Sequence, residues 1–370
     1  MDSQNIPLAQ TSIDREDIEG VLDVLKSGRL ASGDRIVAFE RDFASYVGSK
    51  YACAVSSGTA ALHLAIKALG IGPGDEVITS PFSFIASTNC ILYEGATPIF
   101  ADIDERTFNM DVSKIESLIT PRTKAILPIH IFGQSADMDE IISIAKKHNL
   151  VVLEDACESL GSSYNGKMVG TIGDVGVFGF YPNKQMTTGE GGMLVTDSES
   201  TYDLCKSLSN QGRGRDSVWL SYERMGYNYR LDEMSASLGL TQLGKIDRFI
   251  SERREIAAKY DANLRTIPSL VLPMTESNRT HSWFAYVVRV TNGKRDTVRS
   301  ALRAAGIETR EYFPAIHLQP FMRERFGFKD GDFPVAESIA RETMALPLYV
   351  GLSDVDIKRV ATEISEAIKP

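Results

Sequence analysis

Residues 51–80 read YACAVSSGTAALHLAIKALGIGPGDEVITS, and this stretch decides the fold class. The run YACAVSS is β-rich, and SGTAALHLAIKALG places its apolar side chains at helical spacing. A second β-rich run, DEVITS, closes the stretch. A strand, a helix and a second strand in this order are typical of a parallel sheet whose connecting helices cover its faces.

The same alternation continues along the chain. SFIASTNCILYEG precedes the strand-like TPIFADI, and the helical DMDEIISIAKKHNL lies between TKAILPIHIFG and VVLEDA. We therefore predict an α/β fold in which residues 1–245 form a large domain, with a mostly parallel sheet between helices. Residues 232–265 indicate one long helix or two abutting ones. WFAYVVRV, TVRSALRAAG and DVDIKRVATEISEAI then predict a smaller α+β domain over residues 246–370.

The composition narrows the class of protein. The 370 residues carry a formal net charge of −9 without runs of Lys or Arg, which argues against a nucleic-acid partner. No apolar run approaches the ~20 residues that a membrane-spanning helix needs, and residues 1–17 show no signal-peptide pattern. The four cysteines form no CxxC pair and the five histidines show no ligand spacing. We expect a cytoplasmic protein without a metal.

Unusual segments fall at the ends of predicted strands. In open α/β sheets, ligands bind at the carboxyl ends of the strands. The segments at such ends are SSGT, SPFSF, HIFGQ, EDACES and FYPNK. Their convergence predicts a binding site at this edge of the sheet.

Two of these segments have both a structural and a functional interpretation. In SSGT, Gly58 and Thr59 begin a helix whose first N–H groups could bind a phosphate, although the same residues could simply cap the helix. Asp155 ends an apolar strand, where a carboxylate needs a partner. The carboxylate could form a salt bridge with a basic side chain or cap the start of a helix. It could also pair with the protonated ring nitrogen of pyridoxal phosphate (PLP).

Lys184 lies in GVFGFYPNKQMTTGEGG, between aromatic residues and a glycine cluster. Most lysines are solvated surface charges, but this setting would pack the amine and let the backbone approach a cofactor closely. This setting makes Lys184 a candidate for carrying a cofactor such as PLP as a Schiff base. Phe84, in SPFSF, could belong to the core or provide a flat face for an aromatic cofactor.

Taken together, these motifs resemble those of the sugar aminotransferases of the DegT/DnrJ/EryC1/StrS family, which are PLP-dependent enzymes of fold type I. The resemblance runs nearly end to end and keeps the motifs in order. It is carried by SGRLASGDRIVAFERDFASYVG, SSGTAALHLA, GPGDEVITSPFSFIASTN, PIHIFGQSADMD, EDACESLGSSYNG, GDVGVFGFYPNKQMTTGEGG, GYNYRLDEMSASLGLTQL, HLQPF and ALPLYVGLS.

The resemblance implies a role for each matching residue. Lys184 would form the Schiff base and then move the proton between the substrate carbon and the cofactor C4′. Asp155 would pair with the pyridine nitrogen, and Phe84 would stack on the ring. Glu158 matches a position where the family has Gln or Glu near the cofactor 3-hydroxyl.

For the phosphate, the resemblance implies Gly58, Thr59 and Ala60 of one subunit and Asn228 of its partner. The protein would then be a homodimer with shared active sites. One residue departs from the pattern. Many members have a serine that binds the phosphate five residues before the lysine, where this chain has Gly179.

The same resemblance indicates the reaction. Dehydrating relatives replace the lysine with histidine, so retention of Lys184 implies transamination, with a nucleotide-linked keto-deoxysugar as substrate and glutamate as donor. TTGEGG looks more like the branch that acts at C4 than at C3. Tyr312 and His317, in EYFPAIHLQP, either line the sugar-nucleotide side of the cleft or pack in the small domain. There are two alternatives. The enzyme could aminate a cyclitol or aminoshikimate-like precursor, or the protein could be a non-catalytic regulator with this fold.

Overall fold

A computed structural model describes residues 5–214 and 220–369. Its centre is a seven-stranded sheet in the order β1-β9-β8-β5-β4-β2-β3. Only β9 runs antiparallel to its neighbours within this sheet, which confirms the predicted mainly parallel α/β fold. The strands are β1 (Tyr51–Val55), β2 (Glu76–Thr79), β3 (Thr97–Phe100), β4 (Thr123–Ile126), β5 (Val151–Asp155), β8 (Val175–Gly179) and β9 (Gly192–Thr196).

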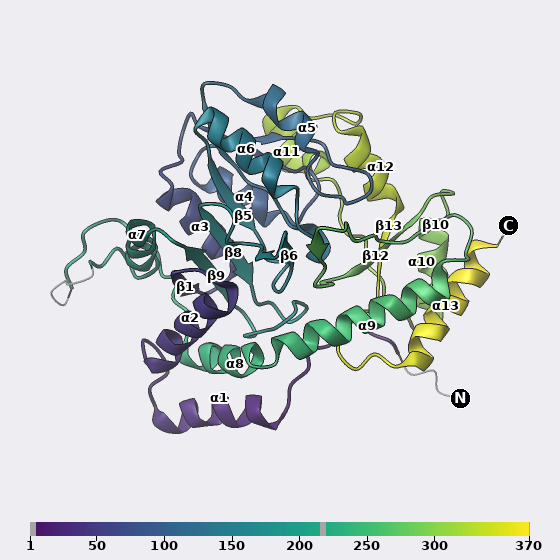
Figure 1. Cartoon of the computed structure of the whole chain (residues 1–370), viewed down its shortest axis with the longest axis horizontal. Helices are drawn as coiled ribbons and strands as arrows, with labels where there is room; N and C mark the ends of the chain where they lie inside the picture. Colours follow the sequence, from purple (N-terminus) through teal and green to yellow (C-terminus); the bar gives the residue numbers. More distant parts are fainter. Residues whose placement is uncertain (1–4, 215–219, 370) are drawn as a thin grey trace.

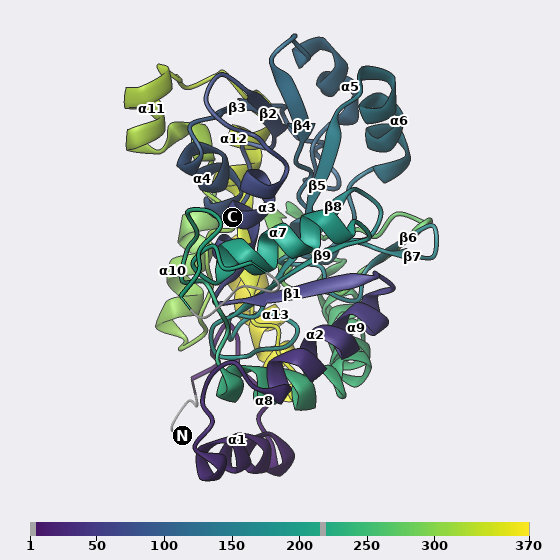
Figure 2. The same cartoon turned by 90° about the vertical axis from the view of Figure 1, so that its left-hand side faces the viewer.

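Helices cover both faces of this sheet. One face packs on α3 (Gly58–Ala68), α4 (Ala86–Tyr93) and α7 (Glu199–Ser209), because their apolar residues share a core cluster with alternate residues of the strands. The other face packs on α2 (Asp34–Val47), α6 (Met138–His148) and α8 (Glu233–Leu243). Figure 2 shows α2 and α8 on one side of β1, with α3 and α7 on the other. The remaining elements of this part are α1 (Arg15–Ser27), α5 (Val112–Ile115), η1 (Glu116–Leu118), η2 (Ile131–Gly133), β6 (Ser163–Tyr164) and β7 (Lys167–Met168).

The long helical run predicted over residues 232–265 is divided in two. After α8, the chain turns at Gly244 and Lys245 and continues as α9 (Ile246–Leu264), which extends toward α13 (Asp354–Ile368) in Figure 1. A second core cluster joins α9, α10 (Arg295–Ala304) and α13 to an antiparallel sheet. That sheet consists of β10 (Leu270–Val271), β12 (Tyr286–Val290) and β13 (Thr343–Leu346). The other elements here are β11 (Arg279–Thr280), η3 (Ile316–Leu318), α11 (Pro320–Phe326) and α12 (Pro334–Glu342).

The N-terminal segment belongs to this second cluster as well. Ile6 is buried in it and forms a parallel bridge with Ile307. Farther along, Thr11 Oγ1 donates a hydrogen bond of 3.0 Å to the carbonyl of Pro182, close to Lys184. A domain boundary near residue 245 stays a prediction, and the small domain that it defines also contacts residues from the start of the chain.

The sheet positions the site. Strands β1, β8, β5, β4 and β2 all run in one direction, so their carboxyl ends meet at one edge. Ser56, Ser80 and Phe180 directly follow β1, β2 and β8, and Asp155 is the last residue of β5. Their side chains therefore surround one space.

Candidate active site

A cleft of about 520 Å³ opens at this edge of the sheet. Residues from four of the five predicted segments line it, and Phe284, Tyr312 and Phe313 close it from the second part of the chain. The lining residues from the predicted segments are Ser57, Gly58, Thr59, Ser83, Phe84, Asp155, Cys157, Glu158, Phe180, Tyr181, Asn183 and Lys184. The volume suits a ligand of cofactor size.

The Lys184 amine lies inside this cleft. Its side chain is only 15% exposed, and Nζ lies 3.6 Å from Glu158 Oε1. The same nitrogen lies 4.0 Å from the centroid of the Phe284 ring. The Lys184 N–H donates to the carbonyl of Tyr181 over 2.9 Å, which fixes the turn after β8. The Lys184 amine is therefore fixed by its neighbours and faces a cavity, so it is not a solvated surface charge.

Asp155 ends β5 with its carboxylate at the base of the cleft. Ser87 Oγ donates to Oδ2 over 2.7 Å, and the Cys157 N–H donates to Oδ1 over 3.1 Å. Each carboxylate oxygen can accept more than one hydrogen bond, so both retain capacity for a ligand. A protonated ring nitrogen in the cleft would satisfy that capacity.

Glu158 adds a second carboxyl group beside the amine. Its Oε2 accepts a hydrogen bond of 3.0 Å from the Phe132 N–H. Burial raises the pKa of the Glu158 carboxyl, and the positive charge of Lys184 opposes this shift in part. The group therefore lies close to the amine in a setting where it can exchange a hydrogen bond with a ligand hydroxyl.

The start of α3 forms an anion seat. Ser57 caps the helix, since its Oγ accepts the Ala60 N–H over 3.1 Å. The N–H groups of Gly58 and Thr59 have no partner within the helix and lie at its positive end. Ala60 is buried and its N–H is already bonded, so the structure brings Gly58 and Thr59, but not Ala60, to the cleft wall.

Gly58, Gly179 and Cys157 meet beside this seat. A Cβ at Gly58 would lie 3.0 Å from Cys157 Sγ and 3.3 Å from Gly179 Cα, which is tighter than ordinary contact. A Cβ at Gly179 would lie 3.4 Å from Cys157 Sγ and 3.8 Å from Gly58 Cα, which are ordinary contacts. Position 58 therefore favours glycine, whereas position 179 accepts a Cβ at ordinary contact distances.

We expect Gly179→Ser to tighten PLP binding about tenfold, because the added hydroxyl can donate to a phosphate at the α3 terminus. Titration of the apoenzyme with PLP, followed by its visible absorbance, measures the dissociation constant. Gly179→Ala is the matched control, since it adds the same Cβ without the hydroxyl. Equal dissociation constants for the serine and alanine variants would contradict the expected contact.

The two aromatic residues predicted from the sequence both line the cleft. Phe84 is 58% exposed, so one face of its ring is free for a ligand. Tyr312 lies parallel to Phe284, with ring centroids 6.0 Å apart. Burial raises the pKa of the Tyr312 hydroxyl, and the nearby charge of Glu158 adds to the shift.

Two other predicted residues lie elsewhere. His317 is fully buried, and its Nε2 lies 3.1 Å from Glu337 Oε1, so the structure does not bring it to the cleft and places it among packed residues. Burial lowers the pKa of His317, against the opposing effect of Glu337. Asn228 bridges to Asn210 on the segment between α7 and α8, which extends outward at the left of Figure 1. It is not a lining residue of its own subunit's cleft.

Several lining residues were missed from the sequence. Phe284 lies within the strand-like WFAYVVRV, where nothing distinguishes it from a core residue, and Phe313 has no local signal. Asn183 could have been found from its place next to Lys184. Its Oδ1 is buried without a hydrogen-bond partner among the described residues, and its Nδ2 lies 3.5 Å from the Tyr312 hydroxyl.

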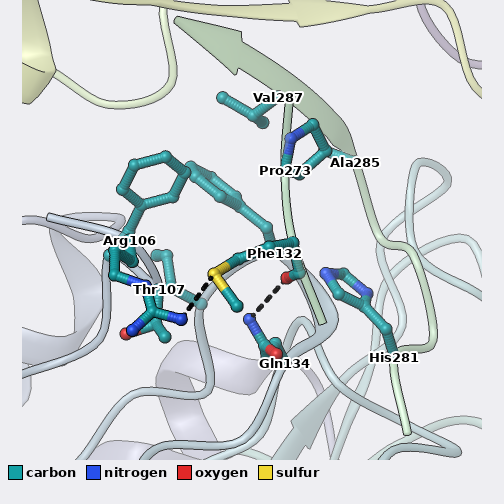
Figure 3. A pocket seen from close by; sticks show the side chains of 11 residues that line it. Arg106, Thr107, Phe132, Gln134, Pro273, His281, Ala285 and Val287 are labelled. Carbon is teal, nitrogen blue, oxygen red and sulfur yellow. Dashed lines mark hydrogen bonds between the residues drawn. The ribbon is translucent and has the colours of Figure 1, made fainter. Parts of the chain in front are cut away.

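A second hollow, drawn in Figure 3, lies between Arg106, Gln134 and His281. Gln134 Nε2 donates to the Met274 carbonyl over 3.0 Å, and Arg106 contacts the Met274 sulfur. Only about 10 Å³ remains open, which is enough for about one water molecule. The large cleft is therefore the better candidate for a ligand.

Residues 5–214 and 220–369 contain neither a metal-binding cluster nor a membrane-spanning helix. No group of three or more His, Cys, Asp or Glu side chains could hold a metal ion there. No helix in the same ranges is both long and apolar enough to cross a membrane.

A lysine amine, a strand-end carboxylate and a helix-terminal anion seat around one cleft are the features of a PLP-dependent transferase of fold type I. The chain belongs to the DegT/DnrJ/EryC1/StrS aminotransferase family, whose sequence profile matches residues 11–365. It is thus a PLP-dependent aminotransferase, and its cofactor is pyridoxal 5′-phosphate.

Individual relatives cover almost the whole chain. The spore coat polysaccharide biosynthesis protein SpsC of Bacillus subtilis is 42% identical over 98% of this chain and 97% of its own. The GDP-perosamine synthase of Caulobacter vibrioides is 39% identical over 99% of both chains. A Streptococcus pneumoniae protein solved in its PLP form is 28% identical over 99% of both chains, with a TM-score of 0.94.

Proposed function

We propose that this enzyme transfers the amino group of glutamate to a nucleotide-linked keto-deoxysugar, at C4 rather than C3. The observation that carries the proposal is the Lys184 amine, held 3.6 Å from Glu158 inside a cleft that also contains Asp155. The 39% identity to a GDP-perosamine synthase supports a nucleotide sugar as substrate. The motif TTGEGG supports the C4 position.

Bound PLP supplies an electron sink for the transamination. Lys184 would hold the cofactor through Nζ and then move a proton at the reacting carbon. Asp155 would accept a hydrogen bond from the ring nitrogen, and Phe84 would cover one ring face. The N–H groups of Gly58 and Thr59 would bind the phosphate.

We also propose a homodimer in which Asn228 reaches the phosphate of the partner's site. Charge supports this arrangement, because the cleft lining contains the carboxylates of Asp155, Glu158 and Glu190 but only one cation, Lys184. The ligands are themselves anionic, so the site needs donors from elsewhere. The segment that carries Asn228 also exposes Leu220, Tyr222 and Met225, which a partner subunit would cover.

A subunit-mixing experiment tests the shared site. Lys184→Ala and Asn228→Ala should each have little activity alone. Mixing equal amounts under exchange should restore about a quarter of the wild-type rate, because half the dimers are hybrid and each hybrid has one intact site of two. Mixing that restores no activity, although mass analysis detects hybrids, would contradict the contribution of Asn228 across the interface.

The substrate class has its own test. Purified enzyme with glutamate should aminate a nucleotide-linked 4-keto-deoxysugar and give little product with scyllo-inosose, as followed by 2-oxoglutarate release and mass spectrometry. A 3-keto isomer is the matched control for position. Turnover of the cyclitol alone would contradict the nucleotide-sugar assignment.

We place this reaction in the cytoplasm. The four cysteines are free thiols, and Cys53, Cys90 and Cys205 are buried, which suits a reducing compartment.

A further inference from the structure

A short chain of hydroxyl groups leads to Asp155. Ser83 Oγ lies 3.0 Å from Ser87 Oγ, and Ser87 Oγ lies 2.7 Å from Asp155 Oδ2. Both serines are buried, with Ser87 in the first turn of α4 and Ser83 in the cleft wall. Phe84 lies just before α4 and lines the cleft, so one short segment contacts both the space for the cofactor ring and the carboxylate for its nitrogen.

The number of available hydrogens fixes the donor and the acceptor in each of these hydrogen bonds. Ser87 has a single hydroxyl hydrogen, and an ionised carboxylate can only accept. The Ser87 hydrogen can also reach the Phe84 carbonyl at 3.2 Å, but the bond to the charged Asp155 is shorter and stronger. Ser83 must then donate to Ser87, so both donors point toward Asp155.

We propose that Ser87 is a positioning residue whose hydrogen bond holds Asp155 as the acceptor for the PLP ring nitrogen and thereby favours the proton on that nitrogen. The inference rests on the proposed pairing of Asp155 with that nitrogen. A hydrogen bond donated to a buried carboxylate stabilises its charged form relative to the neutral acid. With PLP bound, Asp155 would share one proton with the ring nitrogen, and loss of the Ser87 donor would favour that proton on the carboxylate oxygen. The neutral ring is the weaker electron sink.

The neighbouring residue provides a matched control. Thr88 lies on the same helix and is fully buried, but its hydroxyl has no hydrogen-bond partner among the described residues. Thr88→Val therefore removes a buried hydroxyl from α4 without removing a contact to Asp155. Ser87→Ala removes the donor and leaves the rest of the turn in place.

The test compares holoenzymes reconstituted with PLP that carries nitrogen-15 in its ring. In Ser87→Ala, the ring-nitrogen resonance should move toward the neutral pyridine value, PLP should bind about tenfold more weakly, and kcat should fall about tenfold with KM for the keto sugar little changed. Thr88→Val should keep the wild-type resonance and affinity. A wild-type resonance in Ser87→Ala would overturn the proposal.

A double-mutant cycle separates this inference from the role of Asp155. In an Asp155→Ala background, Ser87→Ala should change the PLP dissociation constant less than about twofold, because its partner is gone. An equal loss in both backgrounds would show that Ser87 acts on packing and would overturn the inference alone. If Asp155→Ala itself keeps the protonated-ring resonance and the wild-type kcat, the proposed pairing fails and the role of Ser87 fails with it.

Discussion

Replacing Lys184 with alanine should lower the transamination rate by more than about 10⁴-fold, because the same amine holds the cofactor and moves the proton. The cleft offers no substitute, since Lys184 is the only lysine or arginine among its lining residues. Borohydride reduction followed by mass spectrometry measures the covalent link directly. Wild-type protein should gain a stable PLP adduct, and the variant should gain none.

Lys114→Ala is the control for this change. Its side chain is 58% exposed on α5, so its removal should leave both the adduct and the rate unchanged. A borohydride-stable adduct in Lys184→Ala would place the Schiff base on another lysine. Wild-type protein that stays colourless after PLP is added would instead favour a non-catalytic member of the family.

Asp155→Asn should lower kcat about 10³-fold and weaken PLP binding as well. An amide has nearly the same shape as the carboxylate but no charge to stabilise a protonated ring nitrogen. The Cys157 N–H, which donates to Asp155 Oδ1, can still donate to the amide oxygen, and the amide NH2 then lies where Asp155 Oδ2 accepts from Ser87, so the Ser87 hydroxyl would accept from it. Steady-state kinetics and the PLP titration together separate the loss of chemistry from the loss of cofactor.

Asp111→Asn is the control for Asp155→Asn. Asp111 caps α5, and replacing its carboxylate with a neutral amide should not affect the cleft. An Asp155→Asn variant with wild-type kcat at saturating PLP would show that the ring nitrogen does not depend on this carboxylate.

Much of the fold could be predicted from local pattern. The strands ending at Val55, Thr79 and Asp155 stand out because each contains a short apolar run and is followed by small or polar residues. Parallel strands bring their carboxyl ends together, so Lys184, Asp155 and the start of α3 could be placed in one site before any coordinates.

The rest of the site depends on contacts between distant segments. Phe284 lies 100 positions after Lys184 in the sequence, and only the packing of the second part of the chain brings its ring 4.0 Å from Nζ. The bond from Ser87 to Asp155 joins α4 to β5 and likewise has no local signature. Proximity in sequence also misleads, because Tyr312 and His317 share one motif but only Tyr312 faces the cleft.

The N-terminal segment affects how the enzyme can be divided for engineering. Ile6 pairs with Ile307 and completes a core that residues 246–370 would leave open if they were expressed alone. A chimaera that exchanges the small domain between relatives therefore has to carry both ends of the gene. Since Thr11 also donates a hydrogen bond to the Pro182 carbonyl, in the turn before Lys184, we expect a bulky tag close to the first residues to disturb that turn, and a fusion partner is better placed at the C-terminus.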